Sequence, residues 1–185
     1  RQTLIKKIWG NGYYGDDKEY LNYLAESYRS KGIDVPLFTS DGSKKSNLLD
    51  GAISGLLPTL NFGSRVEENF KDFVELYPDK PKMCMEMWDG WFDAWGDEKH
   101  HTTSAEDYAK VVDDMLKIGS LNMYMFIGGT NFGFTSGANH YETFAPDVTS
   151  YDYDALLTES GDTTPKYFAV RKVIEKYVDH KLPDV

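Results

Sequence analysis

The stretch PKMCMEMWDGWFDAWG (81–96) joins an apolar segment to a run of aromatic side chains. Residues 82–88 are apolar except for Lys82 and Glu86, and this pattern predicts a buried strand. Glu86 is then either paired with a buried lysine or arginine, or it is a functional carboxylate. The tryptophans that follow favour the second interpretation, because a carboxylate beside aromatic faces suits attack on the anomeric carbon of a sugar.

Strands and helices alternate along the rest of the chain. Apolar runs predict strands over 3–9, 34–40, 56–62, 82–88 and 120–127, and we expect a polar loop over 43–54. Helices are predicted over 17–31, after a capping box of Ser64 and Glu67, after Ser104 with Asp107, and from Pro165 to about 178.

This alternation predicts an α/β protein with a parallel sheet covered by helices on both faces. Two folds fit the pattern, a doubly wound sheet and a (β/α)8 barrel. Polar and aromatic residues gather directly after the strands, where either fold places its site. The predicted strands fall short of the eight that a barrel needs, and a full barrel takes roughly 250 residues. No repeat or linker divides the sequence, so 1–185 is interpreted as one partial domain.

Composition excludes some classes of function. The formal net charge of −10 disfavours a nucleic-acid partner or an anionic membrane, because a polyanion would be repelled. No run approaches the roughly 18 apolar residues of a membrane span, and the start of the chain does not resemble a signal peptide. The single cysteine, Cys84, cannot form an internal disulfide, which fits a reducing compartment. The adjacent pair His100 and His101 is poorly placed to chelate one ion, so no metal site is expected.

The segment MEMWDGWFDAWG (85–96) resembles the nucleophile strand of the β-galactosidases of glycoside hydrolase family 35, with Glu86 at the nucleophile position. Further motifs resemble that family in the same order: VPLFTSDG (35–42), LPTLNFGS (57–64), YMFIGGTNFG (124–133) and VTSYDYDALLTESGD (148–162). Several are long and together they span nearly the whole chain, so the sequence is identified as a member of the family. HHTTSAEDYAK (100–110) is more similar to intracellular bacterial members than to lysosomal ones.

The resemblance implies a (β/α)8 TIM-barrel catalytic domain with the nucleophile after the seventh strand and the acid/base after the fourth. The strands predicted here would be the fourth to the eighth. The first three strands, and the β-sandwich domains that usually follow the barrel, would lie outside this sequence. The resemblance therefore implies a central part of a larger enzyme.

The same resemblance assigns residues to the sugar. Trp88 takes the place of an aromatic side chain that lines the pocket, Tyr124 that of a tyrosine near the nucleophile, and Tyr153 that of a tyrosine that contacts galactose. For each of the three, the alternative is a ring that packs in the core. We expect Asn131 and Asp152 to fix loop geometry.

The acid/base position departs from the family pattern. The family has an E-N-E-Y-G segment just before sequence like YYGDDKEYL, and here that sequence follows residues 8–12. Without gaps, Gly10 takes the position of the glutamate and Trp9 that of its asparagine neighbour. A slip of two residues places Asn11 on the substrate-binding asparagine and Gly12 on the glutamate. Neither alignment gives a carboxylate, and loss of the acid/base typically costs about 10²–10⁴-fold in rate.

The resemblance implies retaining hydrolysis of terminal β-D-galactose from an oligosaccharide or glycoconjugate, with Glu86 as nucleophile and without a cofactor. The alternative is a catalytically incomplete sugar-binding or structural piece. Such a piece would need a complementary chain or a second copy to cover its sheet. A cytoplasmic bacterial location is predicted.

Overall fold

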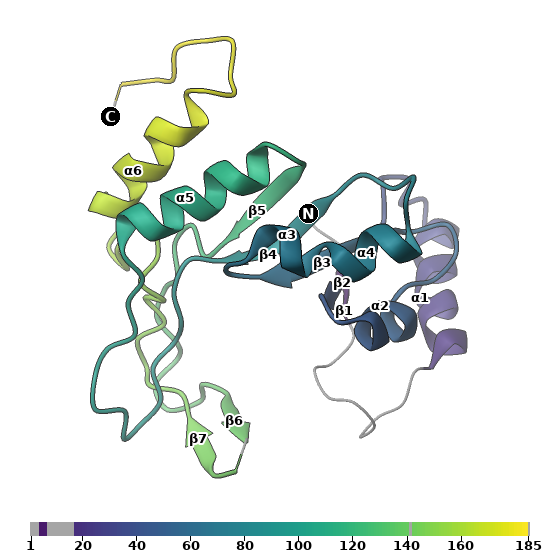
Figure 1. The fold of residues 1–185 in the computed structure, drawn as a ribbon. Helices are drawn as coiled ribbons and strands as arrows, with labels where there is room; N and C mark the ends of the chain where they lie inside the picture. The colour runs from purple at the N-terminus through teal and green to yellow at the C-terminus, as the bar shows by residue number, and fades with distance from the viewer. Residues whose placement is uncertain (1–3, 7–16, 141, 185) are drawn as a thin grey trace. The chain divides into compact units, whose positions relative to one another are not determined.

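This computed structural model describes residues 4–6, 17–140 and 142–184. Five strands form the main sheet of this part of the chain. In sheet order they are β1 (Leu4–Lys6), β2 (Phe38–Gly42), β3 (Leu57–Phe62), β4 (Met83–Trp88) and β5 (Ser120–Tyr124). β1 pairs with β2 and β2 pairs with β3 in parallel, with Phe38 opposite Leu4 and Leu57 (Figure 1). The prediction of an α/β protein with parallel strands is confirmed.

The chain divides into two compact units, which are described separately. Unit 1 comprises residues 1–86 and 118–122, and unit 2 comprises 87–117 and 123–185. β4 and β5 therefore each run from one unit into the other. The helices are α1 (Lys18–Ser30), α2 (Lys45–Gly51), α3 (Val66–Asn69) and α4 (Lys71–Leu76) in unit 1, and α5 (Ala105–Leu116) and α6 (Pro165–Ile174) in unit 2.

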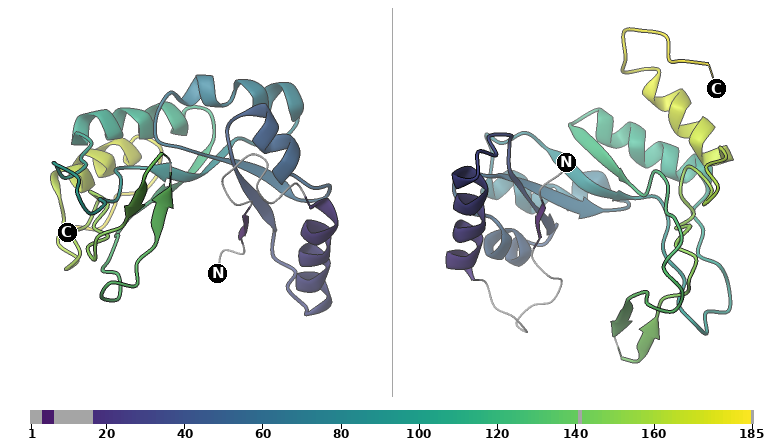
Figure 2. Two further views of the ribbon diagram at one scale, coloured as in Figure 1. Left: turned by 90° about the horizontal axis from the view of Figure 1, so that it is seen from below. Right: turned by 180° about the vertical axis from the view of Figure 1, so that it is seen from behind.

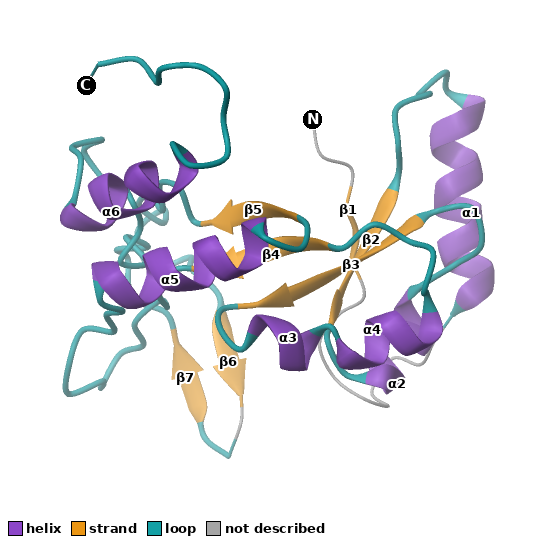
Figure 3. Ribbon diagram, turned by 45° about the horizontal axis from the view of Figure 1, so that its top comes forward, coloured by secondary structure: helices purple, strands orange, loops and turns teal. Residues whose placement is uncertain are grey.

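In unit 1, helices pack around β1–β3 (Figure 3). The predicted helix over 17–31 is α1, which begins after Asp17, whose carboxylate accepts the N–H of Tyr20 at 2.9 Å. It ends before Gly32, which has a φ of +78°. Leu21 on its inner face is buried in a cluster with Leu37 and Leu56. Burial of this apolar face holds α1 against the residues that directly precede β2 and β3.

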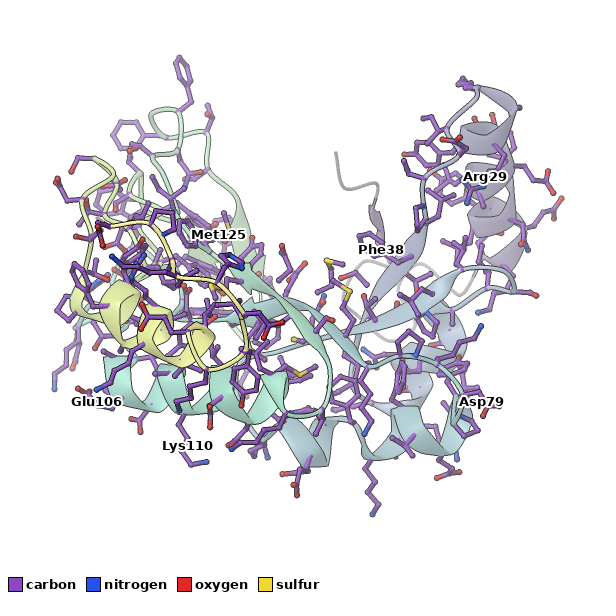
Figure 4. The ribbon with its side chains drawn as sticks, turned by 90° about the horizontal axis from the view of Figure 1, so that it is seen from above. Arg29, Phe38, Asp79, Glu106, Lys110 and Met125 are labelled. Carbon is purple, nitrogen blue, oxygen red and sulfur yellow. The ribbon has the colours of Figure 1, made fainter. Side chains whose placement is uncertain are left out.

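β2 begins four residues later than predicted. The Arg29 guanidinium donates to the carbonyls of Ile33 at 2.7 Å and Val35 at 2.8 Å, so these carbonyls bind a side chain instead of a neighbouring strand. Arg29 and Phe38 are labelled in Figure 4. Pro36 has no N–H to give to a sheet. The ladder therefore begins only after Pro36, where the carbonyl of Leu37 accepts the N–H of Leu57 at 3.2 Å.

Two local predictions in unit 1 are wrong. The expected loop 43–54 contains α2, because the backbone N–H of Lys45 binds the distant Asp72 carboxylate at 2.8 Å and Leu48 is fully buried. The expected capping box at Ser64 does not form. Arg65 precedes the helix with a φ of +52°, and no side chain caps the helix start. The helix also breaks at Phe70, which separates α3 from α4.

In unit 2, α5 and α6 lie side by side in every view (Figures 1 and 2). Tyr108, Val112 and Met115 form the buried face of α5, while Glu106 and Lys110 point away from it (Figure 4). A hairpin that the sequence analysis did not predict is formed by β6 (Ala138–His140) and β7 (Phe144–Pro146). β5 and α6 end three and four residues earlier than predicted, at Tyr124 and Ile174.

The predicted cap of α5 is confirmed and gives a test. The Ser104 hydroxyl accepts the N–H of Asp107 at 3.0 Å. Ser104→Ala should lower the free energy of unfolding by about 1 kcal/mol, because a backbone N–H loses its partner. Urea unfolding followed by circular dichroism measures this change. Ser104→Thr keeps a hydroxyl and serves as the control, and equal stability of the two variants would contradict the role of the cap.

Candidate active site

Glu86 lies inside β4 among buried residues. The residue is 8% exposed, and its neighbours Met85 and Met87 are 3% and 0% exposed. Cys84 in the same strand is fully buried, and burial raises the pKa of its thiol to about 12. The predicted position of Glu86, a carboxylate in an apolar strand, is therefore confirmed. Its role as nucleophile stays a prediction.

The three rings assigned to the sugar belong to one aromatic cluster in unit 2. Trp88 contacts Trp91 edge-on, with ring centroids 5.7 Å apart. Trp91 lies 6.2 Å from Tyr153, and Tyr153 contacts Tyr124 edge-on at 5.3 Å. Residues from β4, from β5 and from the segment after β7 are thus linked by ring contacts through Trp91 and Tyr153. Offset and edge-on ring pairs of this kind are favourable beyond their buried area.

Two further rings extend this cluster and were not assigned to the site from the sequence. Phe92 stacks on Trp91 at 4.9 Å and on Tyr151 at 5.9 Å. The hydroxyls of Tyr124 and Tyr151 are hydrogen-bonded at 3.1 Å. The motif SYDYD contains both Tyr151 and Tyr153, so the spacing of its tyrosines was the signal that could have indicated Tyr151. Tyr153 is 1% exposed, so its ring packs in the core, as in the alternative given in the sequence analysis, and its contact with galactose stays a prediction.

The backbone of residues 151–154, here called the tyrosine loop, lies against two glycines. A Cβ atom on Gly90 would lie 1.9 Å from the carbonyl oxygen of Tyr153, and one on Gly128 would lie 1.8 Å from that of Tyr151. Tyr153 and Asp154 have φ values of +61° and +52°, in the left-handed region that non-glycine residues rarely adopt. Close contact with surrounding groups is needed to hold them there.

A buried cation and two carboxylates lie next to this loop. Lys166 is 4% exposed, and its ammonium donates to the carbonyl oxygen of Asp89 at 2.6 Å and to the carboxylate of Asp154 at 2.6 Å. Asp89 is fully buried, and its Oδ1 accepts the N–H of Met125, a residue labelled in Figure 4, at 2.9 Å. Burial raises the pKa of Asp89 to about 7, against the opposing effects of this N–H and of Lys166.

None of these three residues was singled out from the sequence. Asp89 is part of the segment EMWDGWF (86–92). Lys166 is the second residue of a predicted helix, where a lysine is ordinarily expected to face solvent. A buried carboxyl that follows a buried strand was the available signal for Asp89. No local signal indicated Lys166, because its partners Asp89 and Asp154 lie 77 and 12 residues away in the sequence.

A second polar cluster lies beside the tyrosine loop. The carboxylate of Asp93 contacts Nδ1 of His100 at 2.5 Å and Nδ1 of His101 at 2.8 Å. Nε2 of His100 lies 3.4 Å from the Asp152 carboxylate. The hydrogen bond to Asp93 raises the pKa of His100. Asp152 also accepts the N–H of Asp154 at 3.2 Å, as expected for a residue that fixes loop geometry.

One grouping in this cluster has the ligand types of a metal site. Asp93, Asp97 and His101 bring one ligand atom each within 4.8 Å of one another. Hydrogen bonds account for this proximity, because Asp93 accepts the N–H of His101 at 2.9 Å and Asp97 accepts that of Ala94 at 2.7 Å. The group is partly exposed and carries no argument for a metal. The expected absence of a metal site stays a prediction.

The remaining predicted site positions are Gly10, Gly12 and Asn11, with Trp9 beside them, and they lie outside the described residues. The structure therefore does not test the acid/base position. No helix in the described part of the chain has both the length and the apolar character that a membrane span requires.

Known proteins resemble this chain over nearly its whole length. The sequence profile of the family described as "Glycosyl hydrolases family 35" matches residues 5–177. Human β-galactosidase-1-like protein 3 is 42% identical over 94% of this chain and 26% of its own length. Human β-galactosidase is 43% identical over 93% of this chain and 25% of its own length, and β-galactosidase of Bos taurus is 42% identical over 93% and 26%. The chain spans about a quarter of the length of these curated relatives.

Proposed function

This chain belongs to glycosyl hydrolases family 35, and from that premise we propose that it is part of the catalytic (β/α)8 barrel of a retaining β-galactosidase. Its substrate would be an oligosaccharide or glycoconjugate that ends in β-linked galactose. The observation that carries this proposal is the convergence of Trp88, Tyr153 and Tyr124 on one aromatic cluster. Aromatic faces that stack on the apolar side of a sugar ring, next to a tyrosine hydroxyl, suit galactose.

The reaction that we propose for Glu86 is attack of its carboxylate on the anomeric carbon. The bond from that carbon to the leaving oxygen breaks, and a galactosyl ester of Glu86 forms. Water then attacks the anomeric carbon and releases galactose with retained configuration. Glu86 lies two residues before Trp88 in β4.

Full turnover of natural substrates also needs an acid that protonates the leaving oxygen. Neither Gly10 nor Gly12 carries a carboxyl group. A complementary chain that carries a carboxyl group is the partner that we propose for this role. A leaving group that departs as a stable anion does not need the acid. Formation of the galactosyl ester on Glu86 can therefore be tested in this chain alone.

The test is covalent labelling of the full chain by 2,4-dinitrophenyl 2-deoxy-2-fluoro-β-D-galactoside. Dinitrophenolate leaves without protonation, and the fluorine slows hydrolysis of the ester. We expect one fluorogalactosyl group per chain, located on Glu86 by peptide mass spectrometry. Glu86→Gln should abolish labelling, because a neutral amide is a poor nucleophile.

Glu106→Gln is the matched control, since Glu106 is exposed on α5 and makes the same change of charge. It should label at the rate of the unchanged chain. Absence of labelling in the unchanged chain would contradict the nucleophile proposal and favour a sugar-binding or structural piece. Labelling at any other carboxylate would also contradict it.

A further inference from the structure

Lys166 is a buried cation that has no part in the reaction proposed for Glu86. It is 4% exposed, and its ammonium is within hydrogen-bond distance of three oxygens: Asp89 O at 2.6 Å, Asp154 O at 2.5 Å and Asp154 Oδ2 at 2.6 Å. Its charge also lies 5.8 Å from the centre of the Tyr108 ring. A lysine so deeply buried persists only where such partners replace the water that it loses.

These oxygens belong to two segments that are far apart in the sequence. Asp89 directly follows β4, between Trp88 and Trp91, whereas Asp154 belongs to the tyrosine loop. Lys166 thus ties the turn that carries the tryptophans to the turn that carries Tyr153. Gly90 touches the carbonyl of Tyr153 at the same junction, so the two backbones are in direct contact.

The bonds from Lys166 also bear on the backbone conformation of the tyrosine loop. Tyr153 and Asp154 both have positive φ values, which cost a non-glycine residue of the order of 1–2 kcal/mol each. Lys166 binds both the carbonyl and the carboxylate of Asp154, and the Asp154 carboxylate also accepts the N–H of Thr103 at 2.6 Å. Without the ammonium, the carbonyls of Asp89 and Asp154 and the Asp154 carboxylate would each lose one donor.

We propose that Lys166 is a positioning residue for the sugar site, which holds Tyr153 against Trp91 and Tyr124 by fixing the tyrosine loop to the turn after β4. Lys166 acts through the tyrosine and does not touch the sugar. This inference rests on the proposed function, because that function assigns Tyr153 to galactose.

The first test measures the rate of Glu86 labelling at increasing concentrations of the dinitrophenyl fluorogalactoside. Lys166→Met keeps the length of the side chain and removes the donors. It should lower the second-order labelling constant at least about tenfold, since a misplaced contact group loses the advantage of orientation. Lys176→Met changes an exposed lysine and is the matched control, expected to label at the unchanged rate.

The second test separates positioning through Tyr153 from a general loss of structure. Tyr153→Phe removes only the hydroxyl. If Lys166 acts by placing that hydroxyl, adding Lys166→Met to Tyr153→Phe should change the labelling constant less than about twofold, because coupled residues are not additive. A tenfold further loss in the double variant would overturn the proposal.

A third measurement does not depend on sugar chemistry. In chains labelled with 3-fluorotyrosine, the ¹⁹F resonance of Tyr153 is assigned by its loss in Tyr153→Phe. Lys166→Met should shift this resonance and leave that of Tyr23, which is 63% exposed in unit 1, unchanged. If Lys166→Met does not fold, Asp154→Asn weakens one of the three bonds and should shift the resonance in the same direction.

The outcomes for the two proposals differ. A shifted Tyr153 resonance together with no labelling of any chain would leave Lys166 as the positioning residue and contradict the proposed function. A fall in labelling with an unshifted resonance would overturn the role of Lys166 and leave the function intact.

Discussion

Gly90→Ala is expected to lower the thermal unfolding midpoint by roughly 6–12 °C. A Cβ atom at this position would lie 1.9 Å from the carbonyl oxygen of Tyr153 and 2.9 Å from the Cβ of Asp154. The first of these neighbours is backbone and cannot rotate away. Overpacking against a fixed neighbour costs about 3 kcal/mol or more, and each kcal/mol shifts the midpoint of a chain of this size by about 2–4 °C.

Gly137→Ala is the control for this change. Gly137 also lies in unit 2, and a Cβ there would meet its nearest neighbour, the Asp147 carboxylate, at 3.4 Å, an ordinary contact. Differential scanning calorimetry of the full chain compares the two variants. We expect Gly137→Ala to melt close to the unchanged chain. Equal midpoints for the two variants would show that the tyrosine loop does not lie against Gly90.

The second large effect concerns Asp89 and pH. Its pKa is about 7 in the folded chain and near the ordinary value of 3.8 in the unfolded chain. Between these two values the folded state keeps a proton that the unfolded state releases. Stability therefore falls as the pH rises from about 4 to about 7 and is flat, with respect to this group, above that range. A difference of about three pKa units corresponds to about 4 kcal/mol at most.

Asp89→Asn should remove this dependence, because an amide resembles the neutral carboxyl and does not ionise. In urea unfolding, the variant should match the unchanged chain at pH 4 and exceed it by a few kcal/mol at pH 8. Asp113→Asn is the control. Ion pairs with Lys117 and Lys176 lower the pKa of Asp113 to about 2, so its own dependence lies below pH 4. Parallel curves for the unchanged chain and Asp89→Asn between pH 4 and 8 would contradict the prediction.

The fold could be predicted where local sequence decides it. β4 is a continuous apolar run, and α1 and α5 begin at polar caps that the sequence displays. The choice between a barrel and a doubly wound sheet could not be made from these local patterns, because it depends on how strands close over long distances. Family membership, and not periodicity, favours the barrel.

Prediction failed where a distant residue takes over a local role. α2 begins with a backbone N–H bound to Asp72, 27 residues further along the chain, so no capping signal lies beside it. The late start of β2 has a nearer cause, since the Arg29 guanidinium binds the carbonyls of Ile33 and Val35, four and six residues further along the chain. The first error arises from a tertiary contact and the second from a bond between a side chain and the backbone, and the hydrophobic pattern contains neither.

In the candidate site too, residues in sequence motifs were predicted and residues that matter through their contacts were not. Trp88, Tyr124 and Tyr153 were found because they belong to motifs of the family, and the structure brings their rings together. Lys166 and Gly90 were missed because their importance lies in what they touch. A lysine near the start of an amphipathic helix and a glycine after an aspartate are ordinary features of a sequence.

Cys84 makes the chain convenient for spectroscopy. It is the single cysteine, it is fully buried, and its thiol pKa of about 12 leaves almost no thiolate at neutral pH. Maleimides should therefore not react with the native chain. A cysteine introduced at Lys110, on the exposed face of α5, would be the single reactive thiol and would carry a fluorophore or spin label without background.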